Sequence, residues 1–395
     1  MKAGEIDMRK IGGRAKMKRV LKNKVLRLLG ILSLCLGLIL LTLLAGCASQ
    51  KAPAPREEVA GEETSGDISS LCITDMAGRS LTVPDEINKV FSVSPVGTVL
   101  LYTLAPEKLA GWNYELQPGE KQFILPEYHD LPNLGGWYGK TTGNVEEFLK
   151  VKPDLIVSMG TLEETDLSFA DQLQEQLGIP VVLISGEITE LDEAYIFTGE
   201  LLGVEEKAGE LAQYCRETLE EITAKAQQIP ADRRLRVYYA EGPEGLETDP
   251  QGSVHTQVLD LVGGINVAAV EIGGGGGRSS VSLEQILLWD PDLIIAWSTA
   301  RGGCYEAILN HSDWQGLQAV KNKMVFDIPN EPFNWFDRPY SVNRILGLKW
   351  LGNLLYPEVF TYDLEKEVKE FYAKFYHHEL SPAEVKKMLA NCTRK

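Results

Sequence analysis

Histidine and cysteine are scarce in this 395-residue chain, which has five histidines and six cysteines. The cysteines form no Cys-x-x-Cys pair, and neither a Gly-x-Ser-x-Gly nor a His-Glu-x-x-His pattern occurs. A thiolate metal site, a serine-hydrolase elbow and a zinc-protease helix each need one of these patterns. The sequence therefore predicts that the protein is not an enzyme, with a surface-anchored enzyme as a remote alternative. The cysteines Cys72, Cys215, Cys304 and Cys392 could pair in three ways, which the sequence does not distinguish.

Positive charge is also in deficit, because 39 lysines and arginines face 56 aspartates and glutamates, a net charge of −17. Residues 1–46 carry ten of the basic and two of the acidic side chains, so the chain after them has a net charge of about −25. Such a surface repels polyanions, and we expect no nucleic-acid partner.

The N-terminus has the order of a secretory signal. Basic residues precede an apolar run over residues 28–44, which ends at Leu-Ala-Gly-Cys47. Small residues before a thiol are typical of a bacterial lipoprotein, in which Cys47 carries the lipid. We therefore predict a signal peptide over 1–46, lipidation at Cys47, a flexible Ala-, Pro- and Glu-rich tether over 47–67, and anchorage outside the cytoplasm, on the outer face of the cell membrane or in the periplasm. An ordinary transmembrane anchor is the alternative.

A unit of helix, turn and strand occurs twice in the chain. Residues 145–157 (VEEFLKVKPDLIV) align with residues 283–295 (LEQILLWDPDLII), a period of roughly 140 residues. In each copy the proline ends the helix, the aspartate suits the turn, and the apolar run is typical of a parallel strand covered on both faces. Two copies predict two similar α/β lobes.

Further α/β units surround the two copies. We expect strands over 89–93, 181–184, 235–239 and 324–328, helices from Pro95 and over 257–261, and one long proline-free helix over 204–228. The predicted domains are an N-terminal lobe (68–203), a connecting helix (204–229), a C-terminal lobe (230–361) and a C-terminal helical extension (362–395). The predicted fold class is α/β, with two Rossmann-like lobes whose central, mainly parallel sheets are joined by one long rigid helix. A rigid helix permits only modest closure of the lobes.

Residues 68–361 resemble the substrate-binding lipoproteins of iron-siderophore, heme and vitamin B12 importers. The resemblance is carried by the repeated Glu…Pro-Asp-Leu-Ile blocks, Thr74-Asp-Met-Ala-Gly-Arg79, Gly263-Gly-Ile-Asn266 and Asn334-Trp-Phe-Asp-Arg338, which are specific together and weak singly. It implies a class III periplasmic binding protein, monomeric and without a cofactor, that captures a metal chelate containing Fe or Co between its lobes. It also implies delivery of that ligand to an ABC permease and its ATPase.

Candidate ligand-binding residues are unusual side chains that follow the expected strands, because ligands of open α/β sheets bind at the carboxyl ends of strands. Aromatic rings can stack on a chelate or on its cations, and arginines can bind carboxylates or catecholates. By the resemblance, Trp137 matches a ligand-contacting tryptophan of B12-binding relatives, and Trp335 to Arg338 match a cleft segment. The candidates are Ser94, Trp112, Trp137, Tyr138, Lys140, Arg278, Trp297, Arg301, Trp335, Phe336 and Arg338. The alternative is that each ring packs between elements of a lobe.

Two further features bear on the ligand. The glycine run 273–277 lacks the Gly-Lys-Ser/Thr of a phosphate loop, so we expect either a mobile lip of the cleft that carries Arg278 or a plain surface loop. No metal-ligand set is predicted; His255 is a weak candidate, because an isolated histidine more often bonds backbone or solvent. A small oxyanion such as molybdate or tungstate is the alternative ligand, since it needs only amides and one or two polar groups.

Glu146 and Glu284 hold the same place in both copies of the repeat, at the start of the helix. An acidic residue there stabilises the helix dipole. The resemblance implies a second role, because relatives use one surface glutamate per lobe to meet arginines of the permease. We expect both residues to dock on the permease.

Overall fold

The computed structural model describes residues 70–139, 141–273 and 278–394. The predicted signal peptide, the lipidation site Cys47, the tether and Lys140 therefore lie outside the described residues. In the part that is described, no helix combines the length and the apolar character needed to cross a membrane. The four described cysteines, Cys72, Cys215, Cys304 and Cys392, are free thiols.

The N-terminal lobe is built on a three-stranded parallel sheet with the order β3-β4-β5. Its strands are short and almost wholly buried, as the continuous apolar runs predicted. An antiparallel hairpin, β1–β2, precedes the sheet. The elements are β1 (Ser70–Thr74), β2 (Ser80–Pro84), β3 (Val90–Ser92), α2 (Pro95–Leu104), α3 (Pro118–Lys121), α4 (Val145–Val151), β4 (Leu155–Gly160), α5 (Glu164–Leu177), β5 (Val181–Ser185) and α6 (Leu191–Leu202).

The C-terminal lobe has a four-stranded parallel sheet with the order β11-β10-β6-β8. The elements are β6 (Arg236–Ala240), β7 (Glu247–Thr248), α8 (Gln257–Leu261), β8 (Ile265–Asn266), β9 (Ser279–Ser280), α9 (Leu283–Trp289), β10 (Leu293–Ala296), α10 (Tyr305–Asn310), α11 (Gln318–Lys321) and β11 (Val325–Asp327). The two repeat strands, β4 and β10, lie in different sheets, so the predicted fold class of two parallel-sheet lobes is confirmed.

The aspartate of each Pro-Asp turn has a use that the pattern did not reveal. Asp154 accepts a hydrogen bond from the backbone N–H of Lys89 at 2.8 Å, and Asp292 accepts one from Arg236 at 2.8 Å. Each carboxylate thus caps the first residues of the neighbouring strand, where a backbone donor would otherwise lack a partner. In each lobe the Pro-Asp turn therefore sets the start of its own strand level with the start of the adjacent strand.

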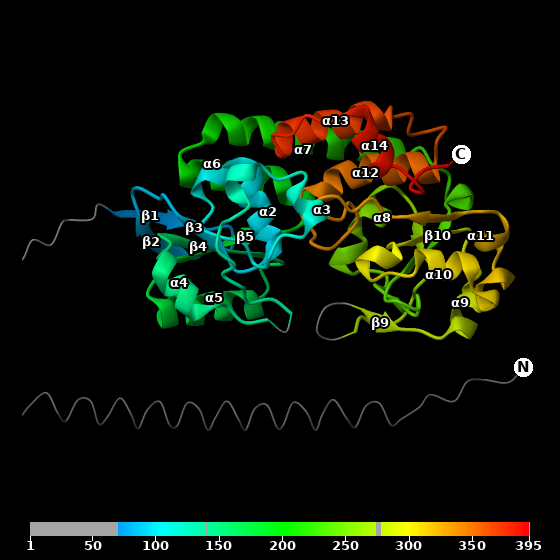
Figure 1. Ribbon diagram of the computed structural model, residues 1–395, viewed down its shortest axis with the longest axis horizontal. Coiled ribbons are helices and arrows are strands. Elements are labelled where there is room, and N and C mark those ends of the chain that lie inside the picture. The colour runs from blue at the N-terminus through cyan, green and yellow to red at the C-terminus, as the bar shows by residue number, and fades with distance from the viewer. Residues whose placement is uncertain (1–69, 140, 274–277, 395) are drawn as a thin grey trace, which may run out of the picture. The chain divides into compact units, whose positions relative to one another are not determined.

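The lobes are joined by more than the expected helix. The helix α7 (Glu205–Ala226) runs where one long helix was predicted, and α12 (Asn343–Leu355) packs against both α7 and α8. Figure 1 shows α7 and α13 (Leu364–Phe375) along the same side, above both lobes. Twelve of the thirteen residues of α12 are buried, so the connection is a packed layer rather than a single rod.

The C-terminal extension is part of the core. Tyr376 lies 6.1 Å from the ring of Tyr102 in the N-terminal lobe, and Phe375 lies 6.0 Å from Tyr195. The Trp350 indole donates a hydrogen bond to the carbonyl of Cys392 at 2.7 Å, beyond α14 (Pro382–Met388). Residues 362–394 therefore hold both lobes together and do not hang from one of them.

Candidate functional site

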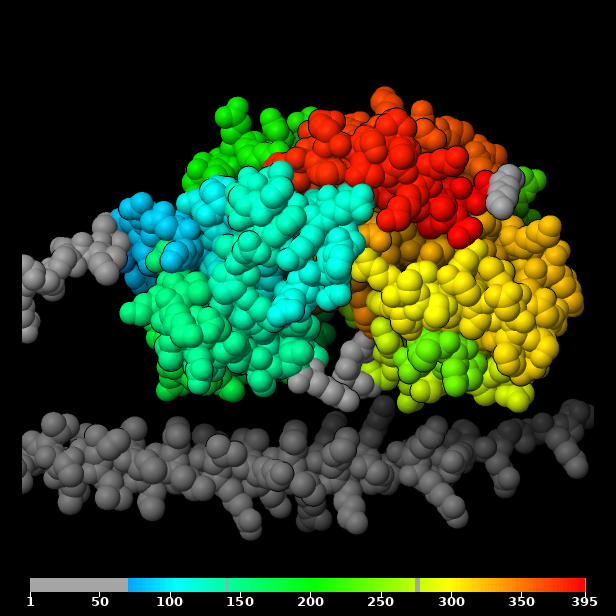
Figure 2. All heavy atoms as spheres, viewed as in Figure 1, coloured from blue at the N-terminus to red at the C-terminus, as the bar shows by residue number. Residues whose placement is uncertain are grey.

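A cavity of about 1100 Å³ lies between the two lobes. In Figure 2 the surface is furrowed between the cyan N-terminal lobe and the yellow C-terminal lobe. On the N-terminal side the cavity is lined by residues that follow β4 and β5, which are Thr161, Glu163, Thr165, Asp166 and Glu187. On the C-terminal side the lining includes residues 252–255, Gln257, Ile272 and Tyr340. Its place at the carboxyl ends of parallel strands is where the fold binds ligands.

His255 and Tyr340 form the aromatic part of this cavity. The rings meet edge to face, with centroids 5.5 Å apart. The backbone N–H of His255 donates to the Ser253 hydroxyl at 3.2 Å, which fixes the turn that carries the imidazole. The imidazole Nδ1 is buried, has no hydrogen-bond partner among the described residues, and lies 3.7 Å from the Asp337 carboxylate.

The charge state of His255 follows from its surroundings. Burial, reinforced by the positive charge of Arg338, lowers the pKa of His255 to about 4. The imidazole is therefore neutral at pH 7, and its nitrogen lone pair is available to a metal centre or to a hydrogen-bond donor.

We expect the His255 resonances in an NMR titration of the folded protein to move near pH 4, and those of the urea-unfolded chain to move near the ordinary value of about 6.5. Because the folded-state pKa is the lower one, the unfolded chain binds more protons between these values. The contribution of His255 to the free energy of unfolding is therefore fully present above about pH 6.5 and is lost as the pH falls toward 4. A folded-state midpoint near 6.5 would contradict the burial of the ring.

Below the imidazole lies a cluster of buried carboxylates around one arginine. The Arg338 Nη1 group donates to Glu241 at 2.7 Å, to Asp249 at 2.6 Å and to Asp337. Burial raises the pKa of Asp337 to about 6 and that of Glu241 to about 9, whereas Arg338, against the effect of burial, lowers the pKa of Asp249. Ligand atoms of Asp249, His255 and Asp337 lie within 4.8 Å of one another, a spacing that could hold a metal ion. In this structure the guanidinium supplies the positive charge there.

A second arginine links the lobes behind the cavity. The Arg344 side chain is fully buried; it donates to the Gly186 carbonyl of the N-terminal lobe at 2.6 Å and to Gln257 at 2.9 Å. Its guanidinium lies 5.4 Å from the centre of the Tyr340 ring. A Cβ on Gly186 would come within 2.9 Å of that ring, so only glycine permits this approach. Arg344 therefore fixes Tyr340 between the lobes.

Three of the predicted ligand-binding rings are in the core instead. Trp335 and Phe336 are fully buried, and Trp112 is 4 % exposed with its indole donating to the Tyr128 carbonyl at 2.8 Å. The Asn334 side chain accepts the backbone N–H groups of the residues two and three positions on, which turns this segment and its rings inward. In this structure none of the three rings presents a face to a ligand, and their assignment as cleft residues is wrong.

The other predicted aromatic positions are half-buried. Trp137 packs edge to face on Phe91 and Phe148, at 6.3 and 6.1 Å, so much of its ring serves the lobe. Tyr138 precedes Gly139, which lines the cavity. Trp297 lies under the guanidinium of Arg278, which is 5.8 Å from the ring centre.

The predicted polar positions are largely engaged by the protein. Arg278 binds Glu241 at 2.9 Å, and Arg338 binds the cluster described above. Arg301 donates to the Asn330 carbonyl at 2.8 Å and pairs with Glu331 at 3.2 Å, outside the cavity. Ser94 is buried at the start of α2, and its backbone N–H points to Ser92, so its predicted role toward an anion is not supported. Lys140 lies outside the described residues.

The residues that sequence reasoning missed include Tyr340, Arg344, Thr161, Thr165 and Glu187. Thr161 follows β4 directly, and Glu187 follows β5 by two residues. The same strand-end rule that selected Trp297 would have selected both. No local pattern marks Tyr340 or Arg344, because the partners that place them at the cavity, His255, Gln257 and Gly186, are distant in the sequence.

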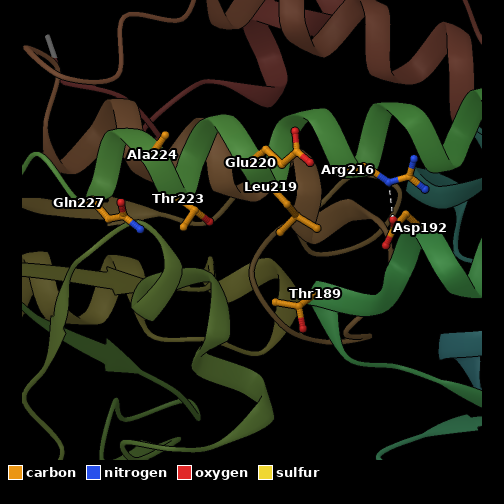
Figure 3. Close-up of a pocket in the computed structure, with 8 residues that line it drawn as sticks. All are labelled: Thr189, Asp192, Arg216, Leu219, Glu220, Thr223, Ala224 and Gln227. Carbon is orange, nitrogen blue, oxygen red and sulfur yellow. Dashed lines mark hydrogen bonds and ion pairs between the residues drawn. The ribbon is translucent and has the colours of Figure 1, made fainter.

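A shallower groove of about 490 Å³ runs along α7 (Figure 3). Thr189 and Asp192 face Leu219 and neighbouring side chains of the helix across it, and Arg216 pairs with Asp192 at 2.8 Å. The Arg216 side chain is 53 % exposed. This groove is the junction of the connecting helix with the N-terminal lobe and presents no buried polar group to a ligand among the residues described.

Two parallel-sheet lobes with a cavity at their strand ends define a bilobed small-ligand-binding protein. Residues 125–332 match the Periplasmic binding protein family, which is more than half of the chain. The chain belongs to this family, the substrate-binding proteins of ABC transporters.

This chain matches named relatives over nearly their full length. The molybdate-binding protein MolA of Haemophilus influenzae is 28% identical, over 78% of this chain and 92% of its own. The vitamin B12-binding protein of Salmonella typhimurium is 28% identical, over 68% of this chain and 90% of its own. A solved ABC transporter solute binding protein from Sulfurospirillum deleyianum is 31% identical with a TM-score of 0.75, covering 81% of this chain and 99% of that one.

Proposed function

We propose that this protein captures a small metal chelate, containing Fe or Co, in the cavity between its lobes and delivers it to the permease and ATPase of an ABC importer. The observation that carries the proposal is the neutral imidazole of His255, which lines the cavity and whose buried Nδ1 has no hydrogen-bond partner among the described residues. A neutral imidazole is a good ligand for transition metals. Tyr340 beside it offers a flat ring to the ligand.

The charge of the cavity supports a neutral or cationic complex over a free anion. The described residues that line it include the carboxylates Glu163, Asp166 and Glu187, and no lysine or arginine. The arginines nearby are engaged: Arg338 with three carboxylates and Arg278 with two. A small dianion would meet a negative field and would need donors that these residues already share.

A molybdate-type oxyanion is the second candidate. It is favoured by the name of the Haemophilus influenzae relative, which is also solved as a molybdate complex, 25% identical to this chain with a TM-score of 0.64 over 79% of it and 99% of that chain. The hydroxyl of Thr165 lies along the cavity and could donate to such a ligand, whereas the hydroxyls of Thr161 and Ser253 already donate to Asp166 at 3.0 Å and to Asp249 at 3.1 Å.

Replacing His255 with alanine is expected to lower the affinity for a metal chelate at least roughly 10–100-fold, because a coordinating or hydrogen-bonding nitrogen is lost. Calorimetric titration of the wild-type protein with ferrioxamine B, a cationic ferric chelate, with cyanocobalamin, which is neutral, and with sodium molybdate measures the selectivity directly. His311→Ala is the matched control, because that side chain is 63% exposed on the C-terminal lobe. Binding of molybdate alone, unaffected by His255→Ala, would reject the chelate in favour of the oxyanion.

Anchorage and docking complete the proposal. The predicted signal peptide over residues 1–46, with lipidation at Cys47, supports attachment of a monomeric protein outside the cytoplasmic membrane. Glu146 on α4 and Glu284 on α9 are both exposed, and each lies in the first turn of its helix. In Figure 1 both helices lie on the side of the lobes away from α7. Two acidic residues, one per lobe on the same side, suit a partner with two related basic sites.

A further inference from the structure

Apolar side chains surround the two docking glutamates. Among the described residues eight large apolar side chains are exposed, and four of them lie on the seven-residue helices α4 and α9. They are Val145, Leu149, Leu287 and Leu288, with exposed fractions of 42, 61, 41 and 79%. Exposed leucines are common singly, but such a concentration on two short equivalent helices marks an interaction surface.

The exposed leucines share a helix face with the glutamates. Leu149 follows Glu146 by three residues, and Leu287 follows Glu284 by three, so each pair lies on one face of its helix. On the opposite face, Phe148 and Ile286 are buried in the lobes at 1 and 0% exposure. The inward residue holds each helix, and the outward face is presented in a fixed orientation.

The two helices differ at one position. Leu288 of α9 corresponds in the repeat to Lys150 of α4, which pairs with Glu147 at 2.6 Å. The C-terminal helix therefore offers a larger apolar face, and the N-terminal helix a more polar one.

The charge of this surface selects its occupant. Glutamates beside the leucines, on a chain with a net charge of −17, would be repelled by anionic lipid head groups. A second copy of the chain would bring like charges together. A membrane protein that offers basic residues beside apolar pockets at two related sites satisfies both the charge and the duplication.

We propose that the leucines of α4 and α9 are buried against the importer's permease, with Leu288 as the dominant contact. This inference rests on the proposed delivery function and adds to it the residues that supply the affinity. The glutamates orient the protein on the permease, and the leucines supply the apolar area removed from water, with the C-terminal lobe contributing more than the N-terminal lobe.

The test uses the full-length acylated protein, reconstituted in proteoliposomes with the permease and ATPase of its own host, with ATPase stimulation as the readout. Leu288→Asp is expected to raise the half-stimulating concentration roughly tenfold or more, the change that follows from one leucine no longer buried. Lys150→Leu is expected to lower that concentration, a gain that misfolding cannot produce. Leu71→Asp, on a leucine 54% exposed in β1, is the matched control and should change nothing.

The charge-reversed double variant Glu146→Lys/Glu284→Lys separates the two proposals. If it abolishes stimulation while Leu288→Asp and Lys150→Leu behave like Leu71→Asp, docking stands and the apolar inference falls. If the double variant leaves stimulation intact as well, the proposed delivery through this face is rejected. Leu288-dependent binding to anionic vesicles without permease, or Leu288-dependent dimerisation in sedimentation, would replace the permease with lipid or with a second copy and overturn the inference.

Discussion

Trp335→Ala is expected to lower the free energy of unfolding by about 3–5 kcal/mol, the range found for large aromatic residues removed from a core. The Trp335 ring is fully buried, and its indole N–H lies 3.4 Å from the Tyr372 hydroxyl. The ring packs in the cluster that contains residues of both lobes and of the C-terminal helices. Removing it therefore leaves a cavity where the lobes are joined.

Denaturant unfolding followed by circular dichroism measures this loss. Trp137→Ala is the control, because its half-buried ring packs within the N-terminal lobe alone, and a smaller loss is expected. An unchanged unfolding midpoint together with lost ligand affinity would show that the Trp335 ring faces the ligand after all.

The fold could be predicted because its signals are local and repeated. The unit 145–157 corresponds to α4 and β4, and the unit 283–295 to α9 and β10, with bounds that agree within three residues. A short continuous apolar run that follows a Pro-Asp turn favours a parallel strand buried on both faces. The long helix α7 could be predicted equally well, because its 22 residues contain no proline and its buried side chains recur at helical spacing on one face.

The site could be predicted less well than the fold, because the direction of a large side chain depends on partners far along the chain. Trp335 follows a strand, as a ligand-binding ring would, yet the turn at Asn334 directs it into the core. Arg338 was expected to meet a ligand, and its carboxylate partners Glu241 and Asp249 stand 97 and 89 residues earlier. Sequence spacing says nothing about such pairs.

The C-terminal helices show the same limit at a larger scale. The segment 362–395 has helical periodicity, which predicts helices but not what they cover. Phe371 and Phe375 stack at 4.5 Å and pack on Tyr214 of the connecting helix. A segment that looks like an addition to one lobe therefore packs on the helix that connects the two lobes.

Arg344→Met is expected to reduce ligand affinity at least roughly tenfold and to cost about 3 kcal/mol of stability, because buried acceptors lose their donor. The Gly186 carbonyl, the Gln257 amide oxygen and the Ser341 carbonyl all accept from this guanidinium. Burial lowers the pKa of Arg344 to about 10, so the side chain remains charged at pH 7. Methionine fills a similar volume but offers neither the charge nor the hydrogen bonds.

Arg344→Lys distinguishes positioning from charge. Lysine keeps the positive charge near the Tyr340 ring but cannot reproduce the planar fork that reaches Gly186 in one lobe and Gln257 in the other. If the planar fork sets the ligand geometry, Arg344→Lys should lose nearly as much ligand affinity as Arg344→Met but should be more stable than Arg344→Met. If the positive charge acts directly on the ligand, Arg344→Lys should also bind the ligand more tightly than Arg344→Met. Equal affinity in all three proteins would mean that the position of Tyr340 does not depend on this link between the lobes. The buried Arg344 side chain contacts both the N-terminal lobe and the ring of Tyr340. Any closure of the lobes is therefore coupled, through Arg344, to the position of Tyr340 against the ligand.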